Sequence, residues 1–102
     1  MKLTFPHYQS AKAVIKALAE RRETDWDVCT HASEEMGDDA IDILDIRSAL
    51  IRAEHVTEQQ DGRYLVRGKD VNLQIIEVVI EVEENPPEIF VITVWKIARR
   101  WL

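Results

Sequence analysis

The sequence contains few of the residues that form disulfides, phosphate-binding loops or metal sites. It has a single cysteine, Cys29, so no internal disulfide can form, and a reducing compartment is expected. The three glycines, at positions 37, 62 and 68, are too scattered for a glycine-rich phosphate loop. The sequence contains no closely spaced cysteine pair and no histidine pair at helical spacing. No cofactor is therefore expected.

Cys29 and His31 are the closest approach to a metal site. On an extended segment a thiolate and an imidazole two residues apart lie on the same side, and Asp38 and Asp39 follow nearby. Zinc sites need three or four ligands, so this is a weak signal. The alternative is a buried, unreactive cysteine beside a histidine that caps a helical turn.

The charge balance and the short apolar runs exclude further classes of protein. Lysine and arginine number 13 against 19 aspartates and glutamates, which leaves a net charge of −6. The protein as a whole has no positive electrostatic potential that would attract phosphates. A polybasic protein that coats nucleic acid or a membrane surface is therefore excluded. The longest nearly apolar stretch, residues 88–97, is far shorter than the roughly 20 residues of a membrane helix. The N-terminus lacks the apolar run of a signal peptide, so a cytoplasmic protein is expected.

A chain of 102 residues with 46% hydrophobic side chains suits one globular domain, predicted over residues 1–102 without repeat or linker. Its first half predicts helices. Behind Ser10, a helix-capping residue type, Ala11, Val14, Ile15 and Leu18 recur at helical spacing. Helices are expected over residues 10–22 and 41–53, the second capped by Asp38 or Asp39. Between them we expect an extended connection over 24–30 and a single helical turn over 31–36, ended by Gly37.

The second half predicts a sheet. Strands are expected over residues 63–69, 73–83 and 89–97, with a short polar edge strand over 55–59. Within 73–83, apolar side chains alternate with glutamates, which indicates one buried and one wet face. The apolar segment 89–97 is expected to be the central strand or the one best covered by helices. The fold class is therefore α+β: two to three N-terminal helices packed on a three- to four-stranded antiparallel meander sheet.

Charged side chains gather on one face of this predicted sheet, whereas Tyr64 belongs to the buried face. The residues expected on the charged face are Arg63, Arg67, Lys69, Glu77, Thr93 and Trp95. Cations, a carboxylate, a hydroxyl and an aromatic ring on one exposed face form a surface suited to phosphate or RNA. The alternative is a solvated face with cross-strand salt bridges, such as Arg63 or Arg67 with Glu77.

His31 is the candidate for acid–base chemistry, because an unperturbed imidazole titrates near pH 6.5. The alternative is that it caps the helical turn that follows. His7 and His55 have no supporting residues nearby. The C-terminal Arg99-Arg100-Trp101-Leu102 crosses the sheet, docks on a partner or frays.

An ordered set of short motifs runs from about residue 28 to residue 97. It begins with Thr-His-Ala-Ser-Glu-Glu-Met at 30–36, continues through Asp39, Asp45, Leu50 and an Arg-Tyr strand at 63–67, and ends with Val-Ile-Thr-Val-Trp-Lys at 91–96. This set resembles a bacterial family of domains of unknown function, short proteins similar to BrnT and RelE-type toxins. The resemblance implies a RelE/barnase-like toxin fold. It also implies a toxin–antitoxin component that cleaves mRNA without a metal, on the ribosome or free, and a helix-turn-helix antitoxin as partner.

The resemblance further implies roles for individual residues. His31 would serve as general acid or base, Arg63 and Arg67 would bind the phosphate, and Glu77 would act as a second base or orient an arginine. The implied RNA-binding residues are Lys69, Thr93, Trp95 and Lys96, with Trp95 stacking on a base. Leu65 and Ser48 stand where the family commonly has arginine and asparagine, which predicts weak or absent activity. The alternative to a toxin is a non-catalytic protein-interaction module.

Overall fold

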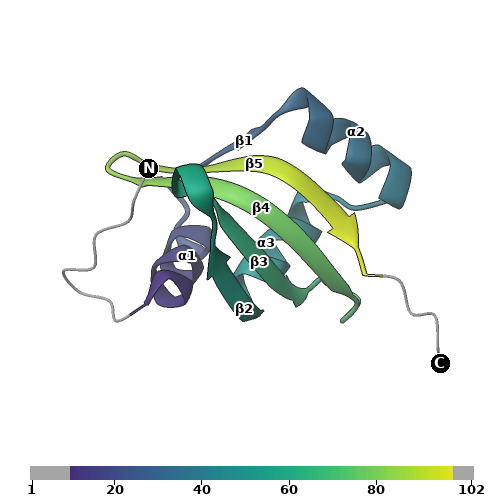
Figure 1. Cartoon of the computed structure of the whole chain (residues 1–102), viewed down its shortest axis with the longest axis horizontal. Coiled ribbons are helices and arrows are strands. Elements are labelled where there is room, and N and C mark those ends of the chain that lie inside the picture. The colour runs from purple at the N-terminus through teal and green to yellow at the C-terminus, as the bar shows by residue number, and fades with distance from the viewer. Residues whose placement is uncertain (1–9, 98–102) are drawn as a thin grey trace.

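The computed structural model describes residues 10–97, which form three α-helices and one five-stranded sheet (Figure 1). In chain order the elements are α1 (Ala11–Glu20), β1 (Asp25–Val28), α2 (Thr30–Asp39), α3 (Ile43–Ile51), β2 (Ala53–Glu58), a 3-10 turn (Gln60–Gly62), β3 (Tyr64–Lys69), β4 (Ile75–Glu84) and β5 (Pro87–Lys96). The strand order across the sheet is β1-β5-β4-β3-β2. Strand β1 pairs in parallel with β5, and the other three pairs are antiparallel. The α+β class is therefore confirmed.

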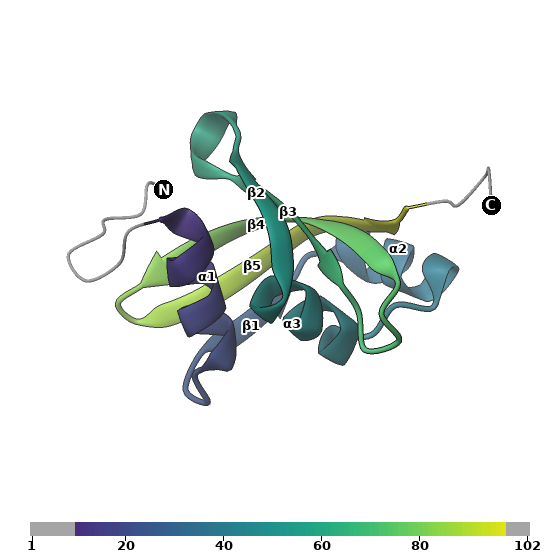
Figure 2. The same ribbon diagram turned by 90° about the horizontal axis from the view of Figure 1, so that it is seen from below.

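The hydrophobic core lies between the sheet and two of the helices. Figure 2 shows α1 and α3 in front of the strands when the molecule is seen from below. The apolar stripe predicted for α1 is buried, and Ser10 caps this helix by accepting a hydrogen bond from the backbone N–H of Ala13. The apolar face of β4 meets these helices, and Tyr64 of β3 is buried there, as the sequence predicts. The fully buried residues with the largest side chains are Tyr64, Ile15, Ile46, Leu50, Ile76, Ile80 and Ile89.

Residues 24–39 differ most from the sequence prediction. The expected extended connection contains β1, which extends the sheet by pairing with β5, and this makes the sheet mixed rather than antiparallel. The expected single turn is a ten-residue helix, α2, which continues through Gly37. It ends at Ala40, whose backbone is left-handed at φ 54°. A lone glycine costs a helix only about 1 kcal/mol, so it does not by itself end one.

The sheet itself corrects two further expectations. In the described part of the chain it has five strands rather than three or four, and β4 rather than β5 is central. Strand β5 is instead the strand best covered by helices, which is the other placement expected for it. Strand β5 is apolar on both faces although β4 is central, and it is flanked by β1 and α2 as well as β4. Helix α3 begins at Ile43 with Asp42 as its cap, because Asp42 and Asp45 form a reciprocal capping box. The predicted polar edge strand is confirmed as β2.

No helix among residues 10–97 is long and apolar enough to cross a membrane. The interpretations of His7 and of the segment Arg99–Leu102 concern positions outside the described residues.

Strand β3 and helix α3 pack so closely at Gly68 that adding a single methyl group there would disturb the contact. A Cβ added at Gly68 would lie 2.1 Å from the carbonyl oxygen of Ala49 in α3, so the helix and the strand would have to separate. We expect Gly68→Ala to lower the free energy of unfolding by about 2–3 kcal/mol, measured by urea denaturation. Gly37→Ala is the control, because nothing lies within 4 Å of its added Cβ, and it should raise stability by about 0.5–1 kcal/mol. Equal stability of the two variants would contradict this packing.

Candidate functional site

One row of side chains crosses the sheet face opposite α1 and α3, which we call the open face. His55 of β2 is in register with Arg67 of β3, Arg67 with Glu77 of β4, and Glu77 with Trp95 of β5. Directly opposed residues on antiparallel strands point to the same face. These four residues, here named the polar row, therefore lie side by side on the open face across four strands.

Glu77 is the centre of the polar row. Its side chain is 14% exposed, and each of its two oxygens accepts a hydrogen bond. Oε2 accepts from Nε of Arg67 at 3.3 Å, and Oε1 accepts from the indole Nε1 of Trp95 at 2.9 Å. The bond to Glu77 uses one of the five N–H donors of Arg67, whose side chain is 45% exposed. The remaining donors can reach an anion on the open face.

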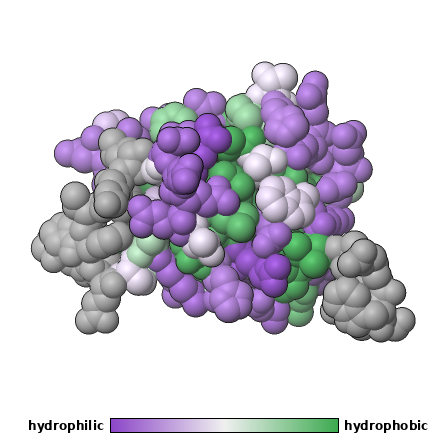
Figure 3. All heavy atoms as spheres, viewed as in Figure 1, coloured by the Kyte–Doolittle hydropathy of each residue, from purple (hydrophilic) through white to green (hydrophobic). Residues whose placement is uncertain are grey.

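A pocket of about 240 Å³ lies beside the polar row, between β2, β3 and β4. It is lined by His55, Thr57, Leu65, Arg67 and Glu77. An imidazole, a hydroxyl, a guanidinium and a carboxylate therefore surround one small space. Figure 3 shows one face of the molecule in the view of Figure 1, with hydrophobic residues toward the middle and hydrophilic ones around them.

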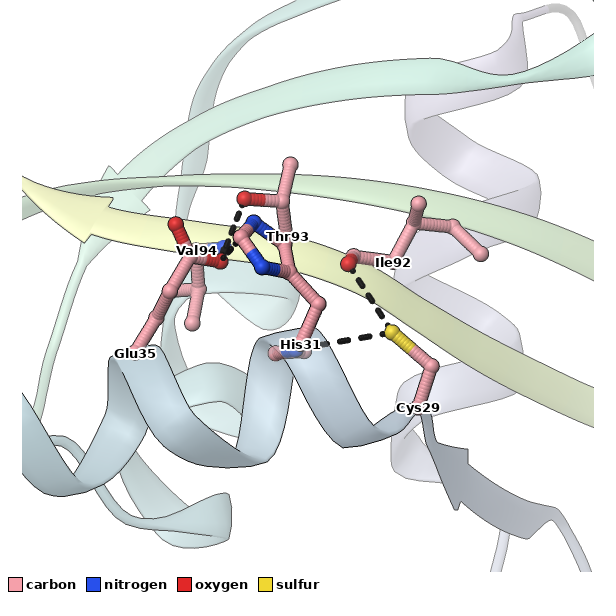
Figure 4. Close-up of polar contacts among 7 residues, drawn as sticks. Cys29, His31, Glu35, Ile92, Thr93 and Val94 are labelled. Atoms are coloured by element: carbon pink, nitrogen blue, oxygen red, sulfur yellow. Dashed lines mark hydrogen bonds and ion pairs between the residues drawn. The ribbon is translucent and has the colours of Figure 1, made fainter.

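A second polar cluster joins α2 to the edge of β5 (Figure 4). Glu35 Oε1 lies 3.4 Å from Nε2 of His31, one helical turn earlier, and accepts hydrogen bonds from the Thr93 hydroxyl and the Val94 backbone N–H. His31 is 68% exposed. The cap of α2 is Cys29, whose Sγ accepts from the Ala32 N–H and donates to the Ile92 carbonyl. The interpretation of His31 as a helix cap is therefore wrong.

This cluster also completes the edge of the sheet. Strand β1 pairs with β5 only as far as Val91. Beyond that point, carboxylates of α2 take the place of a neighbouring strand. Glu35 accepts from the N–H of Val94 and Asp39 from the N–H of Lys96, at 3.2 and 3.4 Å. The edge of β5 is thereby closed to strand pairing.

The structure brings Arg67, Glu77 and Trp95 together, but it separates them from His31. The pocket is lined from β2, β3 and β4, and His31 is not among its lining residues in the described part of the chain. Helix α2 lies beyond β5, which is two strand spacings, about 10 Å, from β3. Thr93 belongs to the cluster around Glu35 rather than to the pocket.

Two of the other predicted cations, Arg63 and Lys69, lie near carboxylates. Arg63 Nε is 3.5 Å from Glu81, and Lys69 Nζ is 3.8 Å from Glu54. With Arg67 and Glu77, the open face therefore carries cross-strand salt bridges, as the alternative interpretation of this surface expects. Lys96 is exposed but in register with Ile76, which faces the core, so it projects from the opposite side of the sheet.

Sequence reasoning missed three residues of these two sites. The sequence predicts no role for His55 and Thr57, although period-two alternation along β2 directs both side chains to one face. Their contact with the pocket depends on the register of β2 with β3, which no local pattern reveals. Glu35 is four residues after His31, a spacing that brings side chains together on a helix, and this signal could have found the pair.

Among residues 10–97, no three histidine, cysteine, aspartate or glutamate side chains gather closely enough to hold a metal ion. One protein-family model matches residues 29–96, and its description is a domain of unknown function (DUF4258). The match covers nearly the same segment as the resemblance noted in the sequence, and its description names no toxin. Searches of curated proteins and of solved structures found no match.

The bonds from Glu35 predict that this side chain holds α2 against the sheet. Glu35→Ala leaves the Thr93 hydroxyl and the Val94 N–H without their acceptor, so we expect unfolding free energy to fall by about 1–3 kcal/mol. The amide hydrogen of Val94 should also exchange faster with solvent. Glu34→Ala is the control, because Glu34 is exposed on the same helix. Unchanged exchange at Val94 in Glu35→Ala would contradict this function of the carboxylate.

Proposed function

This chain belongs to the DUF4258 family of domains of unknown function, and we propose that it is a toxin-like endoribonuclease that cleaves mRNA without a metal ion. The observation that carries the proposal is the polar row. A cation, a carboxylate and an aromatic ring lie in register on an open sheet face, beside a pocket of about 240 Å³. In cleavage of an RNA phosphodiester, the cation would bind the phosphate, the carboxylate would accept a proton and the ring would stack on a base.

Cleavage of RNA by its own 2′-hydroxyl requires one group that takes a proton, one that gives a proton, and donors that stabilise the charged phosphorane. Arg67 supplies planar, paired donors that match phosphate oxygens. Glu77 supplies the carboxylate that takes the proton of the 2′-hydroxyl. Trp95, fixed by its bond to Glu77, supplies a ring on which a base stacks.

His31 is the acid–base group that the sequence resemblance implies. It lies on α2 beyond β5, with Nε2 facing Glu35 and away from Arg67, so the chemistry proposed for the pocket assigns it no step. Arg63 and Lys69 flank Arg67 on the same strand face and would contact neighbouring phosphates. Thr93 would extend the RNA-binding surface along β5, whereas Lys96 projects from the opposite side of the sheet. The salt bridges of Arg63 and Lys69 to glutamates weaken this contribution.

Slow catalysis is part of the proposal. Leu65 lines the pocket at the position where the resemblance implies arginine, so one wall of the site is apolar and uncharged. Ser48, at the position where the resemblance implies asparagine, donates a hydrogen bond from its hydroxyl to the Lys69 carbonyl at 2.9 Å and so links α3 to β3. Leu65 therefore reduces the polar contacts available to a phosphate, whereas Ser48 lies on α3, across the sheet from the pocket.

We expect the purified chain to cleave mRNA in the presence of EDTA. Arg67→Ala should reduce the rate by about 10²-fold or more, because a donor to the developing phosphorane charge is lost. Arg22→Ala is the matched control, since it removes an exposed arginine near the end of α1. The measurement is the initial rate of cleavage of a labelled transcript on a denaturing gel. Intact RNA with the parent protein, or equal rates for both variants, would overturn the proposal.

A helix-turn-helix antitoxin is the partner that the resemblance implies, and an inhibitor fits this function because an unrestrained ribonuclease is harmful to its own cell. We expect the gene to have a neighbour that encodes such a protein. Growth arrest on induction of this chain should be relieved when the neighbour is expressed with it. The readout is colony growth, with an empty vector as the control. Growth arrest that persists beside the co-expressed neighbour would contradict this partnership.

A non-catalytic protein-interaction module is the second candidate. It is favoured by one observation, the pairing of Arg63, Arg67 and Lys69 with glutamates on the open face. A surface whose charges are balanced in this way attracts no polyanion by itself. A parent chain that leaves RNA intact yet forms a stable complex with its neighbouring gene product would favour this function.

A further inference from the structure

The two histidines of residues 10–97 lie on opposite sides of Arg67. His55 is one strand away, in direct register with Arg67 on β2, and it lines the pocket. His31 is on α2, beyond β5, on the same side of Arg67 as Glu77. A proton acceptor and a proton donor therefore flank Arg67 only when the donor is His55.

The spacing of the strands fits the chemistry. Glu77 and His55 are two strand spacings apart, about 10 Å, with Arg67 midway between them. In the in-line displacement at phosphorus, the attacking and leaving oxygens lie on opposite sides of the phosphorus atom. With a catalytic hydrogen bond of about 3 Å to each of these oxygens, the proton acceptor and the proton donor would be roughly 10 Å apart, which matches the separation of Glu77 and His55. A phosphate bound to Arg67 would thus have a carboxylate on one side and an imidazole on the other.

The ring of His55 is available for this function. It is exposed, and among residues 10–97 no hydrogen bond or ion pair occupies either of its nitrogens. Nε2 of His31, in contrast, faces Glu35. Thr57, two residues along β2 from His55, also lines the pocket and can donate its hydroxyl to a phosphate oxygen.

We infer that the pocket between β2, β3 and β4 is the reaction centre for a ribonucleoside 3′-phosphodiester, and that His55 is its proton donor. The inference rests on the proposed ribonuclease function and identifies where its chemistry occurs. Glu77 takes the proton of the 2′-hydroxyl, and the 2′-oxygen forms a bond to phosphorus. The bond from phosphorus to the 5′-oxygen breaks, and protonated His55 gives that oxygen its proton. The products are a 2′,3′-cyclic phosphate and a free 5′-hydroxyl.

Leaving-group chemistry tests the proton donor. The parent chain, His55→Ala and His31→Ala are compared on a ribodinucleotide and on uridine 3′-(4-nitrophenyl phosphate). We expect His55→Ala to cleave the dinucleotide about 10²- to 10⁴-fold more slowly, because the 5′-alkoxide needs a proton to leave. It should cleave the nitrophenyl ester within about tenfold of the parent rate, because nitrophenolate leaves without one. His31→Ala should retain both activities. Equal losses on both substrates in His55→Ala, or loss of dinucleotide cleavage in His31→Ala alone, would overturn the inference.

A binding measurement separates this inference from the proposed function. Uridine 3′-monophosphate is titrated into the full chain, and the ring-proton resonances of both histidines are followed by NMR. We expect the resonances of His55 to shift and those of His31 to remain, with the shift lost in Arg67→Ala. Binding at His55 without cleavage of any RNA would refute the ribonuclease function but support the pocket as a nucleotide site. Cleavage of RNA with no change at His55 would support the function and refute this location. Urea denaturation of each variant shows whether it is folded.

Discussion

The open face of the sheet depends on the carboxylate of Glu77. It is the least exposed of the open-face glutamates that pair with an arginine, and it accepts from both Arg67 and Trp95. In the free chain, a largely buried carboxylate with both oxygens bonded keeps its neighbours in one arrangement, because losing either bond without a replacement would leave its charge poorly paired. The register of β3, β4 and β5 brings these three side chains together. The register in turn depends on the buried faces of β3 and β4.

A second carboxylate, that of Glu35, accepts a backbone hydrogen bond from the part of β5 that has no neighbouring strand. Strand β1 covers only part of β5, and the remaining N–H groups need acceptors. Helix α2 supplies them from Glu35 and Asp39, so a lightly buried helix with one fully buried residue, Ala32, lies along the sheet. Helix α2 thus differs from α1 and α3, which pack through apolar stripes. The location of His31 follows from this polar contact, and it is the reason that His31 lies far from Arg67.

Residues whose partners are local in sequence could be predicted from the sequence. The apolar stripe of α1, the cap at Ser10, the buried faces of β3 and β4, and the shared face of Arg67 and Glu77 all follow from periodicity. What escaped prediction depends on pairing between distant segments. The parallel pairing of β1 with β5 joins residues about 60 positions apart and leaves no periodic signal. The same holds for His55, whose contact with the pocket appears only once β2 is aligned with β3.

Arg67 and Glu77 form a salt bridge on the open face, and the same two groups carry the proposed chemistry when a phosphate is bound. In the free chain, Arg67 and Glu77 neutralise each other, which suits a protein with a net charge of −6. A phosphate that enters the pocket competes with Glu77 for Arg67, since guanidinium groups bind phosphate through paired hydrogen bonds. Transfer of Arg67 to the phosphate releases Oε2 of Glu77 while Trp95 still holds Oε1. The carboxylate would then be free to accept a proton from the bound ribose. The salt bridge between Arg67 and Glu77, which neutralises both groups in the free chain, would thus open when phosphate binds and leave Glu77 able to act as the general base.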